Sequence, residues 1–116
     1  MKEIIFYKAE SGKSPVEDFL DTLDDKQSKK VAWVLKAVRE IDPIPVQYFK
    51  KLVNTQDIWE VMVTMGKNIF RLLGFIDGQD IIVLTNGFQK KTKKTPRSEK
   101  KIAEERKNEY LKRRNK

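Results

Sequence analysis

The sequence predicts an α+β domain in which helices cover a mostly antiparallel sheet. Helix signals are grouped near the start and the end of the chain and do not alternate with strands, which separates this class from βαβ proteins. Apolar segments with strand character follow one another over residues 58–63, 69–76 and 80–86, and Asp77-Gly78 is a strong hairpin signal between the last two. We therefore expect the order β-α-α-β-β-β-α in one domain, which spans all 116 residues.

The first part of the chain predicts one strand and two helices. Residues 3–8 are rich in β-branched and aromatic side chains and predict the strand. Ser14-Pro15 and the pair Asp24 and Gln27 are typical helix starts, the second with the spacing of a capping box. Both helices have an apolar stripe, formed by Val16, Phe19, Leu20 and Leu23 in the first and by Val31, Val34, Leu35, Val38 and Ile41 in the second. These stripes predict an N-terminal helical hairpin that packs on the sheet.

The rest of the chain predicts two long connections and a last helix. Prolines within residues 42–57 indicate a loop, and residues 89–95 form a basic loop. The strand over 80–86 is apolar on both faces, so we expect it to be central. A basic helix is expected over about residues 96–112, followed by a frayed tail.

The composition excludes several kinds of chemistry. The chain has no cysteine and no histidine, which excludes disulfides, thiolate nucleophiles and every triad that uses an imidazole. Acidic residues occur mainly at helix starts and turns, where capping explains them, so we expect no metal and no other cofactor. The start of the chain lacks a signal-peptide pattern, and no apolar run approaches the roughly 20 residues that cross a bilayer. We therefore expect a cytoplasmic protein.

The formal charge of +8 is concentrated at the end of the chain. Residues 1–85 contain 12 Lys/Arg and 13 Asp/Glu, whereas residues 86–116 contain 13 Lys/Arg and 4 Asp/Glu. A concentrated positive field attracts polyanions, because each neutralised phosphate releases condensed counterions. This charge favours nucleic acid or an acidic protein as the partner, and the alternative is a solvated tail that only keeps the protein soluble.

Two separate parts of the sequence supply candidates for a site that binds and cleaves RNA. Arg71 lies within a predicted strand, where it either pairs with Glu60 of the preceding strand or offers its donors to a phosphate. Cleavage also needs a base, and both Glu60 and a lysine whose pKa is lowered by neighbouring lysines qualify. The further candidates are the lysines of the basic loop, Lys90, Lys91, Lys93 and Lys94, together with Arg97 and the aromatic residues Phe88 and Tyr110, which either stack on bases or fill the core.

The same segments resemble a known family. Four motifs occur in the order typical of the phage-derived, HigB-like branch of the RelE/ParE toxin superfamily. They are Ile58-Trp59-Glu60, Phe70-Arg71-Leu72-Leu73, Asp77-Gly78 and Gly87-Phe88-Gln89-Lys90-Lys91-Thr92-Lys93-Lys94-Thr95-Pro96. The segment from Phe6 to Leu20 is also similar to the N-terminal part of that family, so the resemblance covers nearly the whole chain.

The resemblance implies the toxin of a type II toxin–antitoxin system with a RelE-like fold. Such toxins cleave mRNA without a metal, commonly on the ribosome, and a helix-turn-helix antitoxin of the HigA type neutralises them; the complex binds operator DNA through the antitoxin. By position, Arg71 matches the strand arginine of the family, Lys90 and Lys91 match its lysine pair, and Glu60 matches its acidic residue. Met62 stands where relatives often have an arginine, which removes one phosphate contact.

Two other functions fit the same features of the sequence. One is a non-catalytic inhibitor of the ParE type, which acts on DNA gyrase through the same face of the sheet. The other is a plain nucleic-acid-binding module whose basic C-terminal part supplies all of the affinity. Cleaved transcripts distinguish the nuclease from both.

Overall fold

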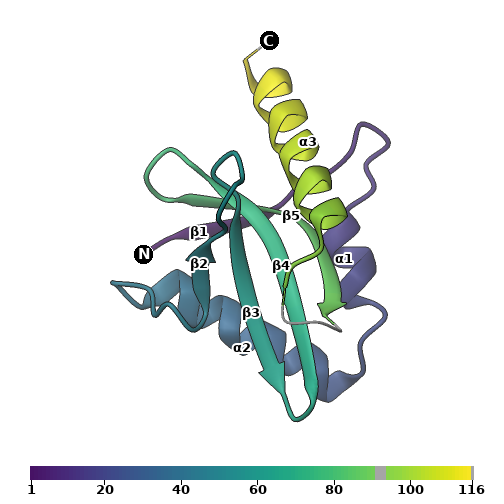
Figure 1. Cartoon of the computed structure of the whole chain (residues 1–116), viewed down its shortest axis with the longest axis vertical. Helices are drawn as coiled ribbons and strands as arrows, with labels where there is room; N and C mark the ends of the chain where they lie inside the picture. The colour runs from purple at the N-terminus through teal and green to yellow at the C-terminus, as the bar shows by residue number, and fades with distance from the viewer. Residues whose placement is uncertain (91–93, 116) are drawn as a thin grey trace.

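The computed structural model describes residues 1–90 and 94–115, in which the chain forms five strands and three helices. The elements in chain order are β1 (Glu3–Phe6), α1 (Pro15–Leu20), α2 (Asp25–Glu40), β2 (Phe49–Lys51), β3 (Trp59–Met65), β4 (Asn68–Asp77), β5 (Ile81–Lys90) and α3 (Arg97–Arg114). The strands form one sheet in the order β1-β5-β4-β3-β2 (Figure 1). Only the pair of β1 and β5 is parallel, so the fold is α+β with a mostly antiparallel sheet, as the sequence predicts.

The two N-terminal helices begin where the capping signals place them. The Ser14 hydroxyl accepts a hydrogen bond from the backbone N–H of Glu17, at 3.3 Å, and Pro15 is the first residue of α1. At the start of α2, the Asp24 carboxylate accepts from the N–H of Gln27 and the Gln27 side chain accepts from the N–H of Asp24, at 2.8 and 3.1 Å. Each cap satisfies donors that have no partner inside the helix.

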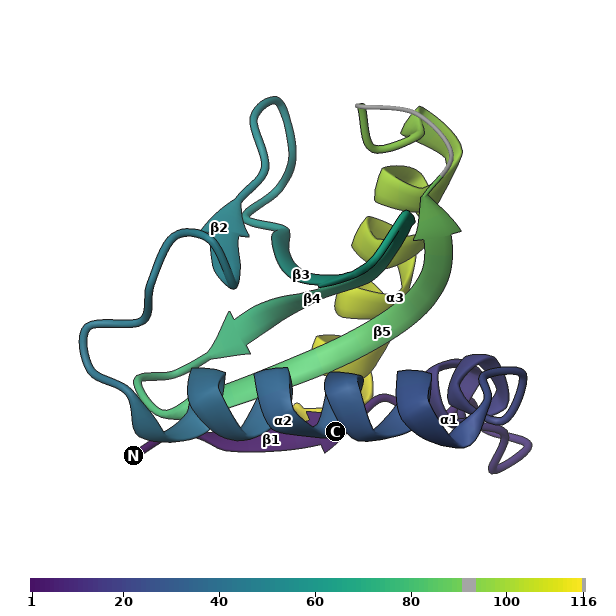
Figure 2. The same cartoon turned by 90° about the horizontal axis from the view of Figure 1, so that it is seen from below.

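Helices cover both faces of the sheet. Helices α1 and α2 pack on one face, against β5 and against β3 and β1, and α3 crosses the other face against β4 and β5 (Figure 2). Covering by the N-terminal helices is confirmed, but the predicted hairpin is not, since α1 and α2 contact the sheet far more than each other. The six-residue α1 is too short to form a hairpin interface. We call the two sides of the sheet the α2 face and the α3 face.

Several elements begin or end at other residues than the sequence predicts. The expected loop over residues 42–57 contains β2, which pairs with β3 at the edge of the sheet. Strand β1 ends at Phe6, and β5 continues to Lys90, so the start of the expected basic loop is paired strand. The strand β5 lies inside the sheet, although the middle position belongs to β4. Helix α3 continues to Arg114 and does not fray at residue 112.

A β-bulge changes which face of the sheet the end of β5 supplies. Leu73 pairs with Asn86 and Gly74 pairs with Leu84, so Thr85 is an extra residue without a partner in the ladder. A Cβ atom on Gly74 would lie 2.1 Å from the carbonyl oxygen of Val83, so this close approach requires glycine. One extra residue reverses the alternation of side chains in the rest of a strand. The side chains after Thr85 therefore change faces relative to those before it.

The outcome of this reversal is visible in the core. Ile82 and Leu84 belong to the apolar cluster on the α2 face, whereas Phe88, with the same even spacing, packs in the cluster on the α3 face. Lys90 follows Phe88 at the same spacing and also reaches the α3 face.

Within the described residues, no helix is long and apolar enough to cross a membrane.

Candidate functional site

A basic groove of about 570 Å³ opens on the α3 face, beside the first turns of α3. Strands β2, β3, β4 and β5 contribute one residue or more each, and the remaining walls come from the turn after β2, from the segment that leads into α3 and from α3 itself. The groove is lined by Lys50, Lys51, Leu52, Val53, Asn54, Glu60, Arg71, Lys90, Lys94, Thr95 and Lys100. Six of these residues are cationic and one is acidic, which makes the groove attractive for an anion.

An ion pair lies buried at the base of this basic groove. Arg71 on β4 donates from Nη1 to Oε2 of Glu60 on β3, and the two residues are 6% and 1% exposed. Taking two charges out of water costs several kcal/mol per ion, so such a pair is stable only with further hydrogen bonds. Among the described residues, the buried Nε of Arg71 has no hydrogen-bond partner. Glu60 therefore holds the guanidinium in place at the base of the basic groove.

Thr95 completes the environment of Glu60. Its hydroxyl donates to Oε1 of Glu60 at 2.5 Å, so each oxygen of the carboxylate accepts one hydrogen bond. Through this contact the buried carboxylate ties β3 and β4 to the segment that precedes α3. The geometry favours a positioning role for Glu60, because both of its oxygens already have donors.

Lys90 is the last residue of β5 and is 8% exposed. Burial lowers the pKa of Lys90, and the positive charge of Arg71 lowers it further, while Glu60 partly opposes both effects. A lowered pKa is what the sequence suggested for this lysine cluster, although crowding by neighbouring lysines was the expected cause. The main cause is desolvation, which disfavours the charged form of any lysine.

The other predicted residues lie in different places. Lys94 lines the basic groove, whereas Arg97 lines a neighbouring hollow. Phe88 packs against the apolar cluster on the α3 face, and Tyr110 contacts the ring of Phe75, with 5.5 Å between the ring centroids. Both aromatic residues therefore fit the core-filling alternative. The predicted positions Lys91 and Lys93 lie outside the described residues.

Three groove lysines were missed by sequence reasoning. Lys50 and Lys51 come from β2, which pairs in register with β3 so that Lys50 stands opposite Glu60. Lys51 also forms an exposed ion pair with Asp57 at 2.7 Å. Lys100 reaches the same groove from α3. A signal for β2 existed in the apolar Phe49 before the two lysines, but three residues between prolines and a turn are too few to show alternation.

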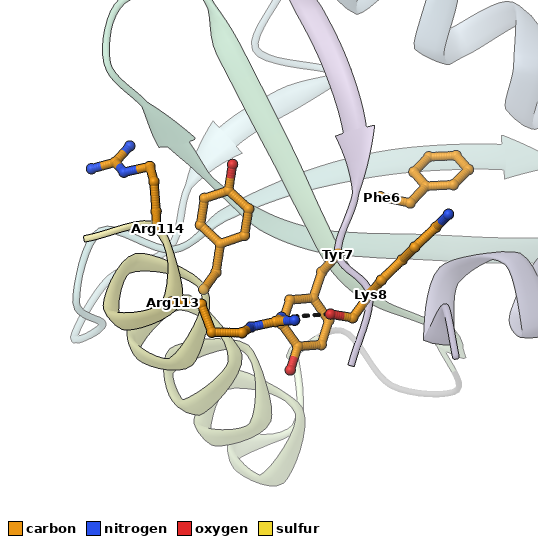
Figure 3. A pocket seen from close by; sticks show the side chains of 6 residues that line it. Phe6, Tyr7, Lys8, Arg113 and Arg114 are labelled. Carbon is orange, nitrogen blue, oxygen red and sulfur yellow. Dashed lines mark hydrogen bonds between the residues drawn. The ribbon is translucent and has the colours of Figure 1, made fainter. Parts of the chain in front are cut away.

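The far end of α3 is held by a separate set of contacts. A hollow of about 400 Å³ lies between the end of β1 and the last turns of α3, and Figure 3 shows the side chain of Arg113 reaching across Tyr7 to the carbonyl oxygen of Lys8. The Tyr7 hydroxyl donates to Glu109, and Arg114 pairs with Asp77. These contacts explain why the helix stays ordered through Arg114.

No group of three or more Asp and Glu side chains with the geometry to hold a metal ion occurs within residues 1–90 and 94–115. The carboxylate at the centre of the basic groove, Glu60, is surrounded by cations and a hydroxyl group. The guanidinium and ammonium groups that line the basic groove bind and stabilise negative charge.

Comparison with known proteins places most of the chain in one family. The family described as Phage derived protein Gp49-like (DUF891) matches residues 18–108, which include every described residue of the basic groove. A comparison with curated proteins finds no match. Because the family match covers well over half of the chain, the protein belongs to the phage-derived Gp49-like family, a RelE-like family of toxin-like proteins.

Proposed function

We propose that this protein is the toxin of a type II toxin–antitoxin pair and acts as a metal-independent mRNA endoribonuclease on the ribosome. The proposal includes the HigB-like branch of the RelE/ParE superfamily and a HigA-like helix-turn-helix antitoxin as the neutralising partner. The family match supports the toxin theme. An isoelectric point of about 9.7 favours an acidic surface on that antitoxin.

One observation carries the proposal. Arg71 and Lys90, which are 19 positions apart, line one groove together with Lys94 and with Lys50 from the edge strand. Four separate segments bring cations together around one buried carboxylate. This arrangement costs free energy, because like charges repel one another and burial disfavours each charge. A polyanion that occupies the groove offsets this repulsion, and RNA supplies the phosphates.

The proposed reaction is transfer of the phosphate to the neighbouring 2′-hydroxyl. The Lys90 amine, in its neutral form, takes the proton of the 2′-hydroxyl, whose oxygen attacks the phosphorus. The bond from phosphorus to the 5′-oxygen breaks, the products are a 2′,3′-cyclic phosphate and a 5′-hydroxyl, and a protonated lysine or water supplies the proton to the leaving oxygen. Arg71, oriented by Glu60, stabilises the extra negative charge on the phosphate through its remaining donors.

The test replaces two groove lysines and two distant lysines with the same loss of charge. The groove variant is Lys90→Gln with Lys94→Gln, and the control is Lys26→Gln with Lys29→Gln, two exposed positions of α2 on the other face of the sheet. Cells that produce the wild type or the control should stop growing and show new transcript ends within translated codons. Cells that produce the groove variant should grow, with at least about tenfold fewer cleaved ends, because binding and transition-state charge are both reduced.

Circular dichroism and thermal unfolding of each purified variant with its antitoxin confirm that the protein is folded. Intact transcripts together with DNA damage in the wild type would refute the nuclease and support a ParE-type inhibitor of gyrase. Growth arrest by the folded groove variant, equal to that of the wild type, would refute the groove as the active site.

A further inference from the structure

A second basic hollow adjoins the basic groove, and nothing in the proposed reaction uses it. This hollow of about 540 Å³ is lined by Asn54, Arg97, Lys100, Lys101 and Glu104. Asn54 and Lys100 also line the basic groove, so the two depressions meet at these residues. We call the second depression the flanking groove. The two grooves together form one track from β5 across the start of α3.

Asn54, which lines both grooves, belongs to the turn after β2 (residues 52–57), which we call the ridge, and contacts with α3 and within the turn hold it in place. The backbone N–H of Gln56 donates to Glu104 at 2.8 Å, and the carbonyl oxygen of Gln56 accepts from Lys107 at 2.7 Å. Within the turn, the Thr55 hydroxyl donates to the carbonyl oxygen of Leu52 at 2.8 Å. Because the ridge is already ordered, a ligand that binds to it causes little further loss of conformational entropy.

The tip of the ridge is unusual for a surface turn. Val53 is 75% exposed, which leaves an apolar side chain over the basic groove. Asn54 beside it has φ of 56°, in the left-handed region that asparagine tolerates better than most residues. An exposed aliphatic group next to an amide offers a base both a van der Waals surface and hydrogen-bonding atoms.

The charges of the flanking groove favour a phosphate. Three cations, Arg97, Lys100 and Lys101, face one carboxylate, Glu104. That carboxylate already accepts a backbone hydrogen bond from the ridge, so part of its charge is compensated. The flanking groove contains no counterpart of the buried pair of Arg71 and Glu60 among its lining residues. Its chemistry is binding without a group placed for catalysis.

We propose that one RNA strand crosses both grooves, so that the flanking groove binds a phosphate next to the scissile one while the base between them rests on the ridge. This inference rests on the proposed function and adds a length requirement to it. The substrate must be a single strand that extends past the cleaved bond, since a duplex places its bases inside the helix, away from the ridge. Contacts in the flanking groove then improve substrate binding and leave the chemical step unchanged.

The test is a charge-matched comparison with single-stranded RNA of two lengths. The flanking variant is Arg97→Gln with Lys101→Gln, and the control is again Lys26→Gln with Lys29→Gln. Binding of a fluorescein-labelled dinucleotide and of a labelled dodecamer is measured by fluorescence anisotropy over a series of salt concentrations. The dodecamer should bind the flanking variant on the order of tenfold more weakly, with the salt slope reduced by about 0.7, the value for one phosphate contact on a single strand.

Two further binding measurements test the length requirement and the role of charge in the flanking groove. The dinucleotide should bind the flanking variant and the wild type equally, because it does not reach past the ridge. Glu104→Gln should tighten dodecamer binding, since it removes the one negative charge and keeps an acceptor for Gln56. Equal losses for both lengths, or a flanking variant that matches the control, would overturn the shared track.

Failure of this inference and failure of the proposed function give different results. Transcripts cleaved in cells, with dodecamer binding that is the same in the flanking variant and the control, would refute the flanking groove alone. The opposite result is that the flanking variant binds the dodecamer more weakly and the dinucleotide normally, while transcripts stay intact in cells. It would support the shared track and refute the nuclease.

Discussion

The two faces of the sheet bury neighbouring residues of the same strand in opposite ways. On the α2 face of β4, Phe70 and Leu72 are fully buried in an apolar cluster. Between them on the α3 face, Arg71 is almost as buried but carries a charge that Glu60 neutralises. Apolar burial stabilises the fold directly, whereas a buried ion pair costs desolvation and often contributes nothing net. The first face therefore stabilises the fold, whereas the charged end of the second face lines the basic groove.

The largest effect is expected when one member of the buried ion pair is removed. Arg71→Ala leaves the carboxylate of Glu60 buried without its guanidinium, so the free energy of unfolding should fall by roughly 3–5 kcal/mol. Urea unfolding measures this loss. Growth inhibition should disappear as well, but this variant alone cannot assign the loss to chemistry.

The double variant Arg71→Met with Glu60→Leu separates the two effects. Replacing a buried ion pair by apolar residues of similar volume is often neutral or stabilising, so unfolding should return close to the wild-type value while growth inhibition stays absent. Recovery of inhibition together with stability would show that the charges act only in folding. A loss below about 1 kcal/mol in the single variant would contradict the buried environment of the pair.

A substitution in the apolar core on the α2 face should lower stability and leave cleavage unchanged. Leu72→Ala should lower the free energy of unfolding by about 2–5 kcal/mol, since it leaves a cavity in the core on the α2 face. Cleavage per folded molecule should stay at the wild-type level, because the basic groove is on the other side. Thr64→Ala, at an exposed position of the neighbouring strand, is the control and should change stability by less than about 0.5 kcal/mol. Loss of cleavage in the folded fraction of Leu72→Ala would contradict the separation of the faces.

The smallest effect concerns pH. The pKa of Lys90 is lowered mainly by burial and then by Arg71, so its neutral amine becomes available at lower pH than that of an exposed lysine. The cleavage rate of ribosome-bound message should therefore rise with pH toward this lowered pKa. Lys90→Arg, which stays charged, should remove the rise. A rise that persists in Lys90→Arg would exclude Lys90 as the base.

The free energy of unfolding should also depend on the protonation of Lys90, and its direction follows from the lowered pKa. Between the lowered pKa of Lys90 in the folded protein and the ordinary lysine value near 10.4, the unfolded chain binds more protons. The free energy of unfolding therefore increases with pH across this window, and below it the charged amine destabilises the fold. Lys90→Gln should lack this increment, which urea titrations at several pH values measure.

Much of the fold followed from local signals, and the exceptions have physical causes. Ser14 and Asp24 set helix starts by hydrogen bonds to residues three positions away, which a sequence shows directly. The strand β2 was missed because three residues held by pairing with β3 have no periodicity of their own. The sequence predicts that the end of α3 frays, and this is wrong because Lys8 and Asp77 hold Arg113 and Arg114. These partners are more than 30 positions away, so local patterns do not reveal them.

The candidate site was predictable in its residue types and less so in its arrangement. The alternative that pairs Arg71 with Glu60 is the one the structure has, and it coexists with a place in the groove. Lys94 and Lys90 were expected beside them, but Lys50, Lys51 and Lys100 were not. A run of charges in the sequence shows which cations are neighbours along the chain. Only the fold shows which cations from separate segments lie close together in space.

Local patterns and composition are enough to predict the α+β class, the helix starts, the absence of imidazole and thiol chemistry, and the charge that accumulates after residue 85. These properties depend on composition and on neighbours within a few positions. The position of Lys90 on the same face as Arg71, in contrast, depends on how the strands pair. A strict alternation from Leu84 would place Lys90 on the α2 face, and the unpaired residue Thr85 reverses it. A bulge is a property of pairing between strands, so it exists only once β4 and β5 have met.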